Sequence, residues 1–502
     1  MFQGTGSDVG KSTLVAGLCR IAAQRGLRVA PFKPQNMSNN AAACKGGGEI
    51  GRAQALQARA CGQEPHVDFN PILLKPQSDR TAQVIVHGHA LKTVSAKDYM
   101  TQQRAMLMQS VLESFARLSD QYDLILIEGA GSPAEINLRT HDIANMGFAQ
   151  EVGSPVCLVG DIDRGGVIAA IAGTKQVIDR SDAKLISSFI INRFRGDPSL
   201  FDEGVRAIAS ITGWPCRGVV PWLNSALELP QEDAVVLDNV QHNQTKQNEK
   251  LLIAVPMLSR IANFDDLDPL KAEPKVNLVF VRPGTPLPLH ADAIIIPGTK
   301  STIADMQFMV KQGWDHDIIA IARRGGRILG VCGGYQLLGE SIHDPQGVEG
   351  DTLAIDGLGL LAVSTTMMAY KSTKPVEGIC ARSRLPISGY EIHMGVTNGK
   401  DALTPLFKLA ECQDTADKGE YNNEDGALSA DSRVEGTYVH GLFSSDAYRG
   451  WWLDSLRPGA SSDLRYERSI EQALDRLADG LRQSLNTGAL LRDARPAQGL
   501  TQ

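Results

Sequence analysis

The chain has 502 residues, too many for one hydrophobic core, and this length predicts two or three folding units. Its 50 Lys and Arg against 57 Asp and Glu give a net charge of −7 without a dense basic run, so we do not expect nucleic acid as a partner. No stretch approaches the roughly 20 apolar residues of a membrane-spanning helix, which predicts a protein without a membrane-embedded part.

The eight cysteines are scattered along the chain. Neither a CxxC pair nor a Cys/His cluster at zinc spacing occurs, so we expect neither a disulfide framework nor structural zinc. The chain begins directly on a glycine-rich loop, with no apolar segment of a secretory signal. These features predict a protein of the reducing cytoplasm.

A glycine-rich loop at residues 4–13, GTGSDVGKST, has the composition of a site for a nucleoside triphosphate. Glycines let backbone N–H groups face the phosphates, Lys11 brings a positive charge to the β and γ groups, and the Ser12 hydroxyl can ligate Mg²⁺. The alternative is a glycine turn that only caps a helix. The residues expected to bind the nucleotide are Gly4, Gly10, Lys11, Ser12 and Thr13.

Short runs rich in Ile, Leu and Val recur in the first half at residues 122–129, 154–161 and 184–192. Runs of this kind, joined by helical segments, are typical of buried parallel strands and predict an open α/β sheet. Glu128 ends the first run, where such a sheet gathers its ligands, so it is a candidate to hold Mg²⁺ beside the loop. The alternative is a carboxylate that caps the following turn.

A polar, amide-rich segment separates two series of predicted strands. It predicts a linker at residues 231–249 between a first domain, residues 1–230, and a second α/β domain, residues 250–450. Apolar residues at helical spacing over residues 469–485 predict a packed helix within a C-terminal extension, residues 451–502. The apolar runs of the second domain lie at residues 251–258, 276–281, 292–298 and 326–334.

Cys332 stands among glycines, after a predicted strand and before a predicted helix. This is the setting of a nucleophile elbow, in which a helix N-terminus supports the thiolate and backbone N–H groups form an oxyanion hole. A second donor is expected from the glycine turn at residues 297–302. His440, at the end of a short strand, is the expected base, and His393 competes for that role. For the cysteine and for the histidines, simple packing is the alternative.

Distinctive segments are spread over nearly the whole chain. They are GTGSDVGKST (4–13), APFKPQNMSNNA (30–41), EIGRAQALQARACG (49–62), NPILLKP (70–76), IEGAGSPAEINL (127–138), GDIDRGGV (160–167), GVCGGYQLLG (330–339) and GYEIHMG (389–395). Together these segments resemble the cobyric acid synthase family.

The resemblance implies an α/β protein with an N-terminal P-loop domain of the dethiobiotin synthetase type, whose first glycine lies one position early, and a C-terminal domain similar to class I glutamine amidotransferases. Cys332 would attack the side-chain amide of glutamine, with His440 as general base and acid. Many such domains place a glutamate two residues after the histidine, but here that residue is Leu442. The resemblance therefore implies a Cys–His dyad without a third member.

For the first domain, the resemblance implies ATP- and Mg²⁺-dependent amidation of the b, d, e and g carboxylates of adenosylcobyrinic acid a,c-diamide to adenosylcobyric acid. The reaction would pass through acyl phosphates and use ammonia from the Cys332 site. By analogy, Glu49 would join Ser12 and Glu128 at the metal. Asn192 would contact the nucleobase. The residues expected to shape the acceptor site are Asp161, Asp163 and Arg164.

Two other functions stay open. The sister activity, cobyrinic acid a,c-diamide synthesis, is disfavoured by the segment PFKPQNMSNN (31–40) and by the order of the domains. A partitioning-type ATPase shares the phosphate loop, but such proteins carry a second lysine where this chain has Gly6 and have no use for Cys332. No DxHxxG element occurs, so we expect a corrinoid to be a substrate and not a bound cofactor.

Overall fold

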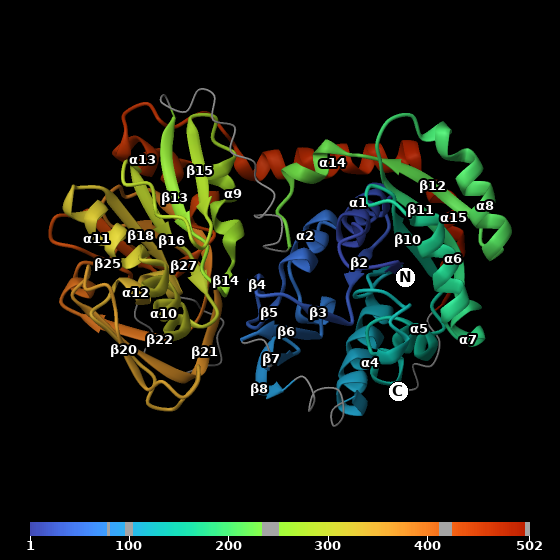
Figure 1. Ribbon diagram of the computed structural model, residues 1–502, viewed down its shortest axis with the longest axis horizontal. Coiled ribbons are helices and arrows are strands. Elements are labelled where there is room, and N and C mark those ends of the chain that lie inside the picture. Colours follow the sequence, from blue (N-terminus) through green and yellow to red (C-terminus); the bar gives the residue numbers. More distant parts are fainter. Residues whose placement is uncertain (78–80, 96–103, 233–249, 411–423, 497–502) are drawn as a thin grey trace.

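Two α/β halves lie side by side in the computed structural model (Figure 1). The first half holds the residues up to Glu232 and the second begins at Lys250, so most of the predicted linker 231–249 lies outside the described residues. The structure describes residues 1–77, 81–95, 104–232, 250–410 and 424–496.

The first half is built on parallel strands whose carboxyl ends share one edge. These strands are β1 (Phe2–Gly4), β2 (Val29–Phe32), β9 (Leu124–Ile127), β10 (Val156–Asp161), β11 (Ile186–Phe194) and β12 (Cys216–Pro221). Strands β1, β10, β11 and β12 form a sheet in this order, and the pair β2–β9 adjoins β1 through a bridge between Phe2 and Glu128. The expected open α/β sheet is confirmed.

Successive residues of β10 point into different cores, so both faces of the sheet are covered. Val159 packs with α1 (Lys11–Gln24), and Leu158 packs with α6 (Val167–Val177). The other elements of this half are β3 (Gln35–Met37), β4 (Ala41–Ala43), β5 (Glu49–Gly51), β6 (Ile72–Pro76), β7 (Thr81–Val86), β8 (His89–Ser95), α2 (Arg52–Ala60), α4 (Arg104–Gln121), α5 (Met146–Val152), α7 (Arg180–Ala183), α8 (Asp202–Thr212), η1 (Val67–Phe69), η2 (Ile136–His141), η3 (Pro198–Phe201) and η4 (Asn224–Glu228).

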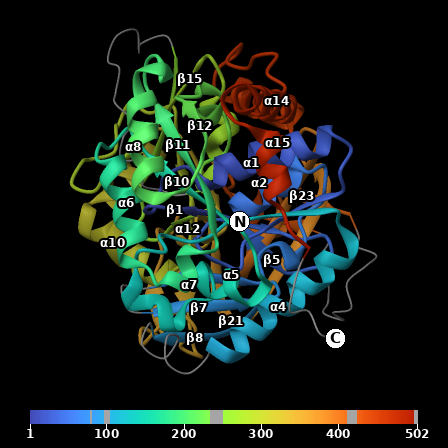
Figure 2. The same ribbon diagram turned by 90° about the vertical axis from the view of Figure 1, so that its right-hand side faces the viewer.

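The C-terminal tail returns to the first half. Helices α14 (Tyr466–Ser484) and α15 (Thr487–Asp493) lie beside α1 (Figure 2). A Cβ atom on Gly17 of α1 would lie 2.4 Å from Leu481 Cδ1, so only glycine allows this close approach of α1 and α14. The expected helix is present, and it completes the core of the first half although it follows the second half in sequence.

The second half contains a mainly parallel sheet in the order β15-β13-β16-β18-β26-β25. Four of its strands coincide with the apolar runs predicted from the sequence. Three of these runs are almost wholly buried because their strands lie inside the sheet, and the run at residues 276–281 is half-buried because its strand lies at the edge. The strands are β13 (Leu251–Pro256), β15 (Val276–Val281), β16 (Ala293–Ile296), β18 (Arg327–Val331), β25 (Ala427–Leu428) and β26 (Val434–Thr437), with helices α9 (Asp268–Lys271), α10 (Thr302–Gln312), α11 (Trp314–Arg323), α12 (Gly333–Leu338) and α13 (Asp446–Leu456).

A long antiparallel hairpin dominates a further sheet, in the order β20-β19-β21-β22-β27. Its strands are β19 (Ser341–His343), β20 (Ala354–Asp356), β21 (Val363–Cys380), β22 (Pro386–Gly399) and β27 (Val439–His440), and the smaller elements nearby are β14 (Ile261–Ala262), β17 (Gly298–Thr299), β23 (Phe407–Leu409), β24 (Glu424–Asp425), η7 (Phe264–Leu267), η8 (Asp401–Leu403) and η9 (Leu442–Ser444).

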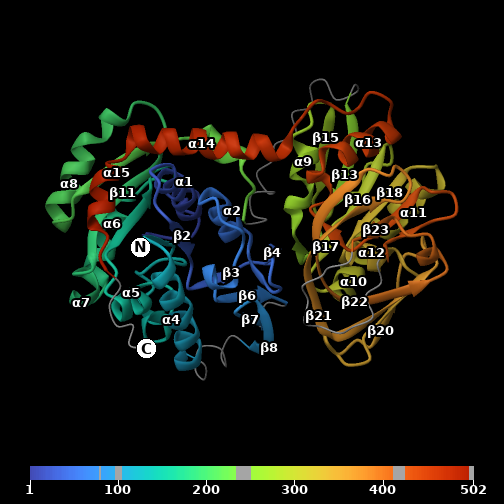
Figure 3. The same cartoon turned by 180° about the vertical axis from the view of Figure 1, so that it is seen from behind.

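The two halves meet where β4 of the first half faces β21 and β22 of the second (Figure 3). Ala41, Leu73 and Ile85 of the first half form an apolar cluster with Ile392 of β22. This contact brings the carboxyl edge of the first sheet toward the elbow of the second. Within the described part of the chain, no helix has the length and apolar composition needed to cross a membrane.

Candidate active sites

The phosphate loop, residues 4–13, runs from the end of β1 into the start of α1. Lys11 Nζ donates hydrogen bonds to the backbone oxygens of Gly6 at 3.1 Å and Gly131 at 3.2 Å, and burial lowers the pKa of Lys11 to about 8. Gly10 has a φ of 88°, and a Cβ atom there would lie 2.3 Å from Asn192 Nδ2. Asn192 donates to Val9 O at 2.9 Å, so the structure places it against the loop backbone.

Carboxylates meet the loop at the second residue of α1. Ser12 Oγ lies 2.7 Å from Glu128 Oε1 and 3.1 Å from Glu232 Oε2. Glu128 also accepts hydrogen bonds from Lys33 Nζ at 2.9 Å and from Gln57 Nε2 at 2.6 Å. Burial favours a raised pKa for Glu128, but Lys33 together with the hydrogen bonds from Gln57 and Ser12 outweighs burial and the pKa is lowered, so the carboxylate is ionised.

Glu232 escaped the sequence analysis because it falls within the predicted linker, where no apolar pattern marks a position. Its carboxylate lies 2.6 Å from Asn36 Nδ2 as well as beside Ser12. Two carboxylates and a hydroxyl are the hard oxygen donors that Mg²⁺ prefers. The residues gathered here therefore fit a magnesium ion.

Glu49 does not join Ser12 and Glu128, and the prediction of Glu49 as a metal ligand is corrected. Its carboxylate accepts hydrogen bonds from Lys75 Nζ, at 2.9 Å, and from Lys371 of the second half. Burial alone would raise the pKa of Glu49, but Lys371 and Lys75 outweigh it and lower the pKa to about 2. Each carboxylate oxygen of Glu49 thus accepts a hydrogen bond from one of these two lysines, at the interface between the halves.

Cys332 occupies a strained elbow between β18 and α12, with a φ of 54° and a ψ of −111°. Its glycine neighbours leave no room for side chains: a Cβ atom on Gly334 would lie 2.0 Å from Ile296 O. Gly298 of the predicted glycine turn packs against the site, because a Cβ there would lie 3.2 Å from His440 Cε1. The sequence therefore placed the elbow and its neighbouring turn correctly.

His440 has a carboxylate partner, Asp266, which the expected Cys–His dyad does not include. His440 Nδ1 lies 2.6 Å from Asp266 Oδ2, and Asp266 Oδ1 accepts a hydrogen bond from Gly441 N at 2.7 Å. Burial alone would lower the pKa of His440, but Asp266 and then Cys332 outweigh it and raise the pKa to about 10. Asp266 lies 174 positions before His440, so no spacing in the sequence could reveal it.

His393, the competing histidine, lines the same cavity as Cys332 and His440 but has other hydrogen-bond and ring partners. Its Nδ1 lies 2.9 Å from Gly395 O, its Nε2 lies 3.6 Å from Glu391 Oε2, and its ring stacks on Tyr438 at 3.8 Å. Leu442, at the position of the missing glutamate, is buried in the apolar core.

The cavity around Cys332 is shared between the halves. The second half contributes Cys332 and His440, and the first half closes the cavity from the other side. The charged or amide side chains that line it are Asn39, Lys75 and Gln77 of the first half and Asn263, Lys300, Gln336, Glu349 and Lys371 of the second.

The residues predicted to shape the acceptor site gather beside the phosphate loop. Arg164 Nη2 lies 2.6 Å from Asp8 Oδ2, and Arg193 bridges Asp8 and Asp161. Asp163 pairs with Arg195 at 2.5 Å. These ion pairs place a charged surface at the carboxyl edge of β10 and β11.

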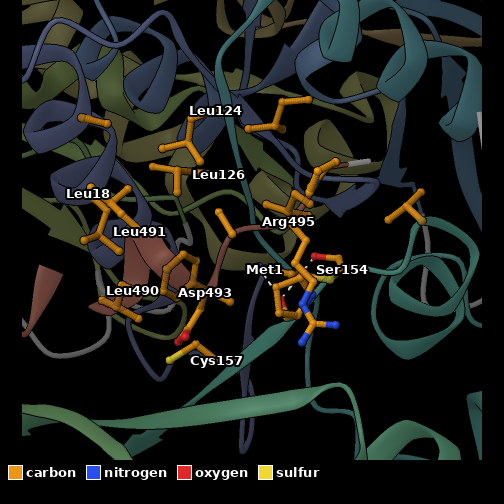
Figure 4. A pocket seen from close by; sticks show the side chains of 18 of the residues that line it. Met1, Leu18, Leu124, Leu126, Ser154, Cys157, Leu490, Leu491, Asp493 and Arg495 are labelled. Atoms are coloured by element: carbon orange, nitrogen blue, oxygen red, sulfur yellow. Dashed lines mark hydrogen bonds between the residues drawn. The ribbon is translucent and has the colours of Figure 1, made fainter. Parts of the chain in front are cut away.

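A separate cavity of about 630 Å³ lies at the amino ends of β9 and β10, beneath α15 (Figure 4). Leu124 and Leu126 of β9, Cys157 of β10 and Leu490 of α15 line it. It contains neither Ser12 nor Cys332 and lies at the edge of the sheet away from the phosphate loop.

Comparisons with known proteins agree with this geometry. Residues 1–236 match the CobQ/CobB/MinD/ParA nucleotide binding domain, and residues 252–448 match the CobB/CobQ-like glutamine amidotransferase domain. The chain is 60% identical to "Cobyric acid synthase" of Hyphomonas neptunium, over 97% of this chain and 95% of that one. The matching proteins of Paracoccus denitrificans and Brucella suis are 55% and 52% identical, over 99% and 98% of this chain and the same shares of theirs.

The fold and the two matched domains define an ATP-binding, glutamine-hydrolysing ligase. At these identities over nearly its full length, the chain belongs to the cobyric acid synthase family, which confirms the resemblance read from the sequence. The chain therefore acts in the amidation chemistry of cobalamin biosynthesis, with glutamine and a corrinoid as substrates.

Proposed function

We propose that the protein amidates the b, d, e and g carboxylates of adenosylcobyrinic acid a,c-diamide and yields adenosylcobyric acid. The observation that supports this proposal is that one chain of this family holds a Cys332–His440–Asp266 cluster and a phosphate loop with two carboxylates, in two halves that pack against each other. Each amidation would consume one glutamine and one ATP.

Glutamine hydrolysis starts with the attack of Cys332 Sγ on the side-chain amide carbon. His440 takes the thiol proton and donates it to the departing nitrogen, so ammonia leaves and a γ-glutamyl thioester remains. Water, activated by His440, then breaks the C–S bond and releases glutamate. Asp266 holds His440 in the orientation and tautomer that this proton transfer requires.

In the first half, the phosphate loop and Lys11 would hold the triphosphate of ATP. A substrate carboxylate would attack the γ-phosphorus to give an acyl phosphate and ADP, and ammonia would displace phosphate from the acyl carbon to leave a carboxamide. Ser12, Glu128 and Glu232 would hold Mg²⁺, which supplies charge neutralisation for the phosphates. Lys33 keeps Glu128 ionised for this role.

Product analysis tests the proposal. The purified protein is supplied with the a,c-diamide, ATP, Mg²⁺ and glutamine labelled with ¹⁵N in its amide, and mass spectrometry counts the labelled nitrogens. We expect four labelled amides. In a parallel assay with cobyrinic acid in place of the a,c-diamide, two labelled amides, with none added to the a,c-diamide, would instead establish the sister activity.

A further inference from the structure

The turn η7 contacts His440 directly and is linked to the phosphate site through residues of the first half. It follows Asn263, and it contains Asp265 and Asp266. All three side chains are buried and polar, and each points to a different partner. Asn263 faces the first half, Asp265 faces α2, and Asp266 faces His440.

One connection runs from the phosphate site through Asn40. Glu232, whose carboxylate lies beside Ser12, accepts a hydrogen bond on its backbone oxygen from Asn40 Nδ2 at 2.6 Å. Asn40 Oδ1 accepts from Asn263 N at 2.6 Å, and Asn263 Oδ1 accepts from Ala41 N at 2.9 Å. Asn263 is thus clamped to the first half by its backbone and its side chain.

A second connection runs through helix α2. Gln57 donates to Glu128 at the phosphate site, and Arg52, at the start of the same helix, forms an ion pair with Asp265 at 2.7 Å. Arg52 N also donates to Asn40 O at 3.1 Å, so the two connections share a junction. A shift of α2 relative to the second half would therefore change the contacts that hold η7 in place.

The backbone of η7 depends on these contacts. Asn263 adopts a left-handed φ of 51°, which costs free energy for a residue with a side chain and persists only where its surroundings fix it. Asp266 N donates to Asn263 O at 3.1 Å, so the position of Asn263 sets the start of the turn that carries the triad carboxylate.

We propose that η7 couples the two active sites, so that a nucleotide at the phosphate loop changes the position of Asp266 and with it the reactivity of Cys332. In the structure, the Ser12 hydroxyl contacts Glu128 and Glu232. A nucleotide–metal complex competes for these same oxygens, so the contacts that lead to η7 differ between the free and the bound protein. The proposal rests on the proposed function, because it assigns ATP to Ser12 and glutamine to Cys332.

Alkylation of Cys332 tests the coupling without turnover. The full-length protein is treated with iodoacetamide, with and without Mg²⁺ and the non-hydrolysable analogue β,γ-imido-ATP, and peptide mass spectrometry follows Cys332 alone. For the unmodified sequence we expect the nucleotide to change the alkylation rate by about fivefold or more, the lower end of common coupling strengths.

Three substitutions then locate the coupling. Asn263→Gly removes one clamp and accepts the left-handed backbone without strain, and Arg52→Met removes the second connection. We expect each to reduce the nucleotide effect and the double substitution to reduce it below about twofold. Arg59→Met, on the same helix but paired with Glu467 and Glu471 of α14, is the matched control and should keep the full effect.

The reverse measurement uses the reciprocity of coupled binding. The affinity for the nucleotide analogue should change on alkylation of Cys332 by the same factor, and this change should vanish in the double variant. Synthesis from ammonium salt shows that each variant is folded. An alkylation rate indifferent to nucleotide, or an equal effect in all variants, overturns the coupling. Failure to amidate the a,c-diamide, with coupling intact, instead overturns the substrate assignment.

Discussion

Lys300 is the charged residue of the cavity around Cys332 whose side chain makes no ion pair or hydrogen bond with the described part of the chain. It lines the cavity with Cys332 and Glu349. Burial, with Lys75 nearby, lowers the pKa of Lys300 to about 8. Glutamine carries a carboxylate and an ammonium at the end opposite its amide, and Lys300 and Glu349 offer charges that match them.

We expect Lys300→Met to raise the KM for glutamine at least about tenfold, because a charge-assisted hydrogen bond to the α-carboxylate is lost. Synthesis from ammonium salt should be unchanged. In the unsubstituted protein, kcat/KM for glutamine should fall as the pH rises through about 8, where Lys300 loses its proton, and the variant should lack this fall. Lys311→Met, at an exposed position of α10, is the control. An unchanged KM would remove Lys300 from the glutamine site.

Asp266 is the residue whose role the sequence could not predict. Asp266→Asn keeps the size of the side chain but removes the charge that orients His440 and raises its pKa to about 10. We expect kcat for glutamine hydrolysis to fall by about a hundredfold or more, by analogy with other triads. The alkaline limb of the pH profile should move to lower pH, because the protonated imidazole loses its stabilisation. A variant that keeps both its rate and its profile would show that Cys332 and His440 act as a dyad.

The strongest predictions from the sequence concerned residues inside motifs. The local backbone around Cys332 and Lys11 requires glycines. The spacing of these glycines in the sequence therefore predicts the elbow and the loop. Asp266 and Glu232 are placed by tertiary contacts, across 174 positions to His440 and 220 to Ser12, and no local pattern records such contacts. Glu49 was assigned to the metal by analogy with the family, and the sequence alone does not show that Lys75 and Lys371 lie at its carboxylate.

At the scale of elements, the buried parallel strands were predictable and the hairpin β21–β22 was not. Strands such as β16 are apolar throughout, and this composition predicts that both faces of the strand are buried. The hairpin instead mixes Lys, Ser and Thr with alternating buried positions over more than a dozen residues, and it gains its order from pairing and from the interface. Lys371 on this hairpin reaches Glu49 of the other half.

Helix α14 stabilises the helix that carries the phosphate loop. Leu481 is fully buried against Gly17 of α1. We expect Leu481→Ala to lower the free energy of unfolding of the first half by about 3 kcal/mol, from lost burial and the cavity left behind. Urea unfolding measures the loss. The neighbouring substitution Arg482→Ala, on the exposed side, should cost less than about 0.5 kcal/mol, and an equal loss for both would contradict this packing role.

At the scale of the whole molecule, the interface between the halves contains a buried charge cluster. Glu49 lies between Lys75 of its own half and Lys371 of the other. Glu49→Gln would leave two buried ammonium groups facing each other without a counter-charge, a change that typically costs about 3 to 5 kcal/mol. We expect a lower Tm and a larger loss of glutamine-dependent than of ammonium-dependent synthesis.

The same variant separates an interface role from a metal role. The Mg²⁺ concentration that gives half-maximal ammonium-dependent synthesis should stay within about twofold for Glu49→Gln. Glu128→Gln, which removes a carboxylate beside Ser12, should raise that concentration at least about tenfold. A raised Mg²⁺ requirement in Glu49→Gln would restore Glu49 as a metal ligand.

The return of α14 to the first half has a consequence for how such a gene can be divided. The chain leaves the first half at Glu232, builds the second half and comes back, so the glutaminase half is topologically an insert. If the gene were cut between codons 232 and 250, helix α14 would be made with the second half, although its apolar face belongs to the core of the first half. Two independently soluble subunits would require the codons for α14 and α15 to be moved behind those of the first half.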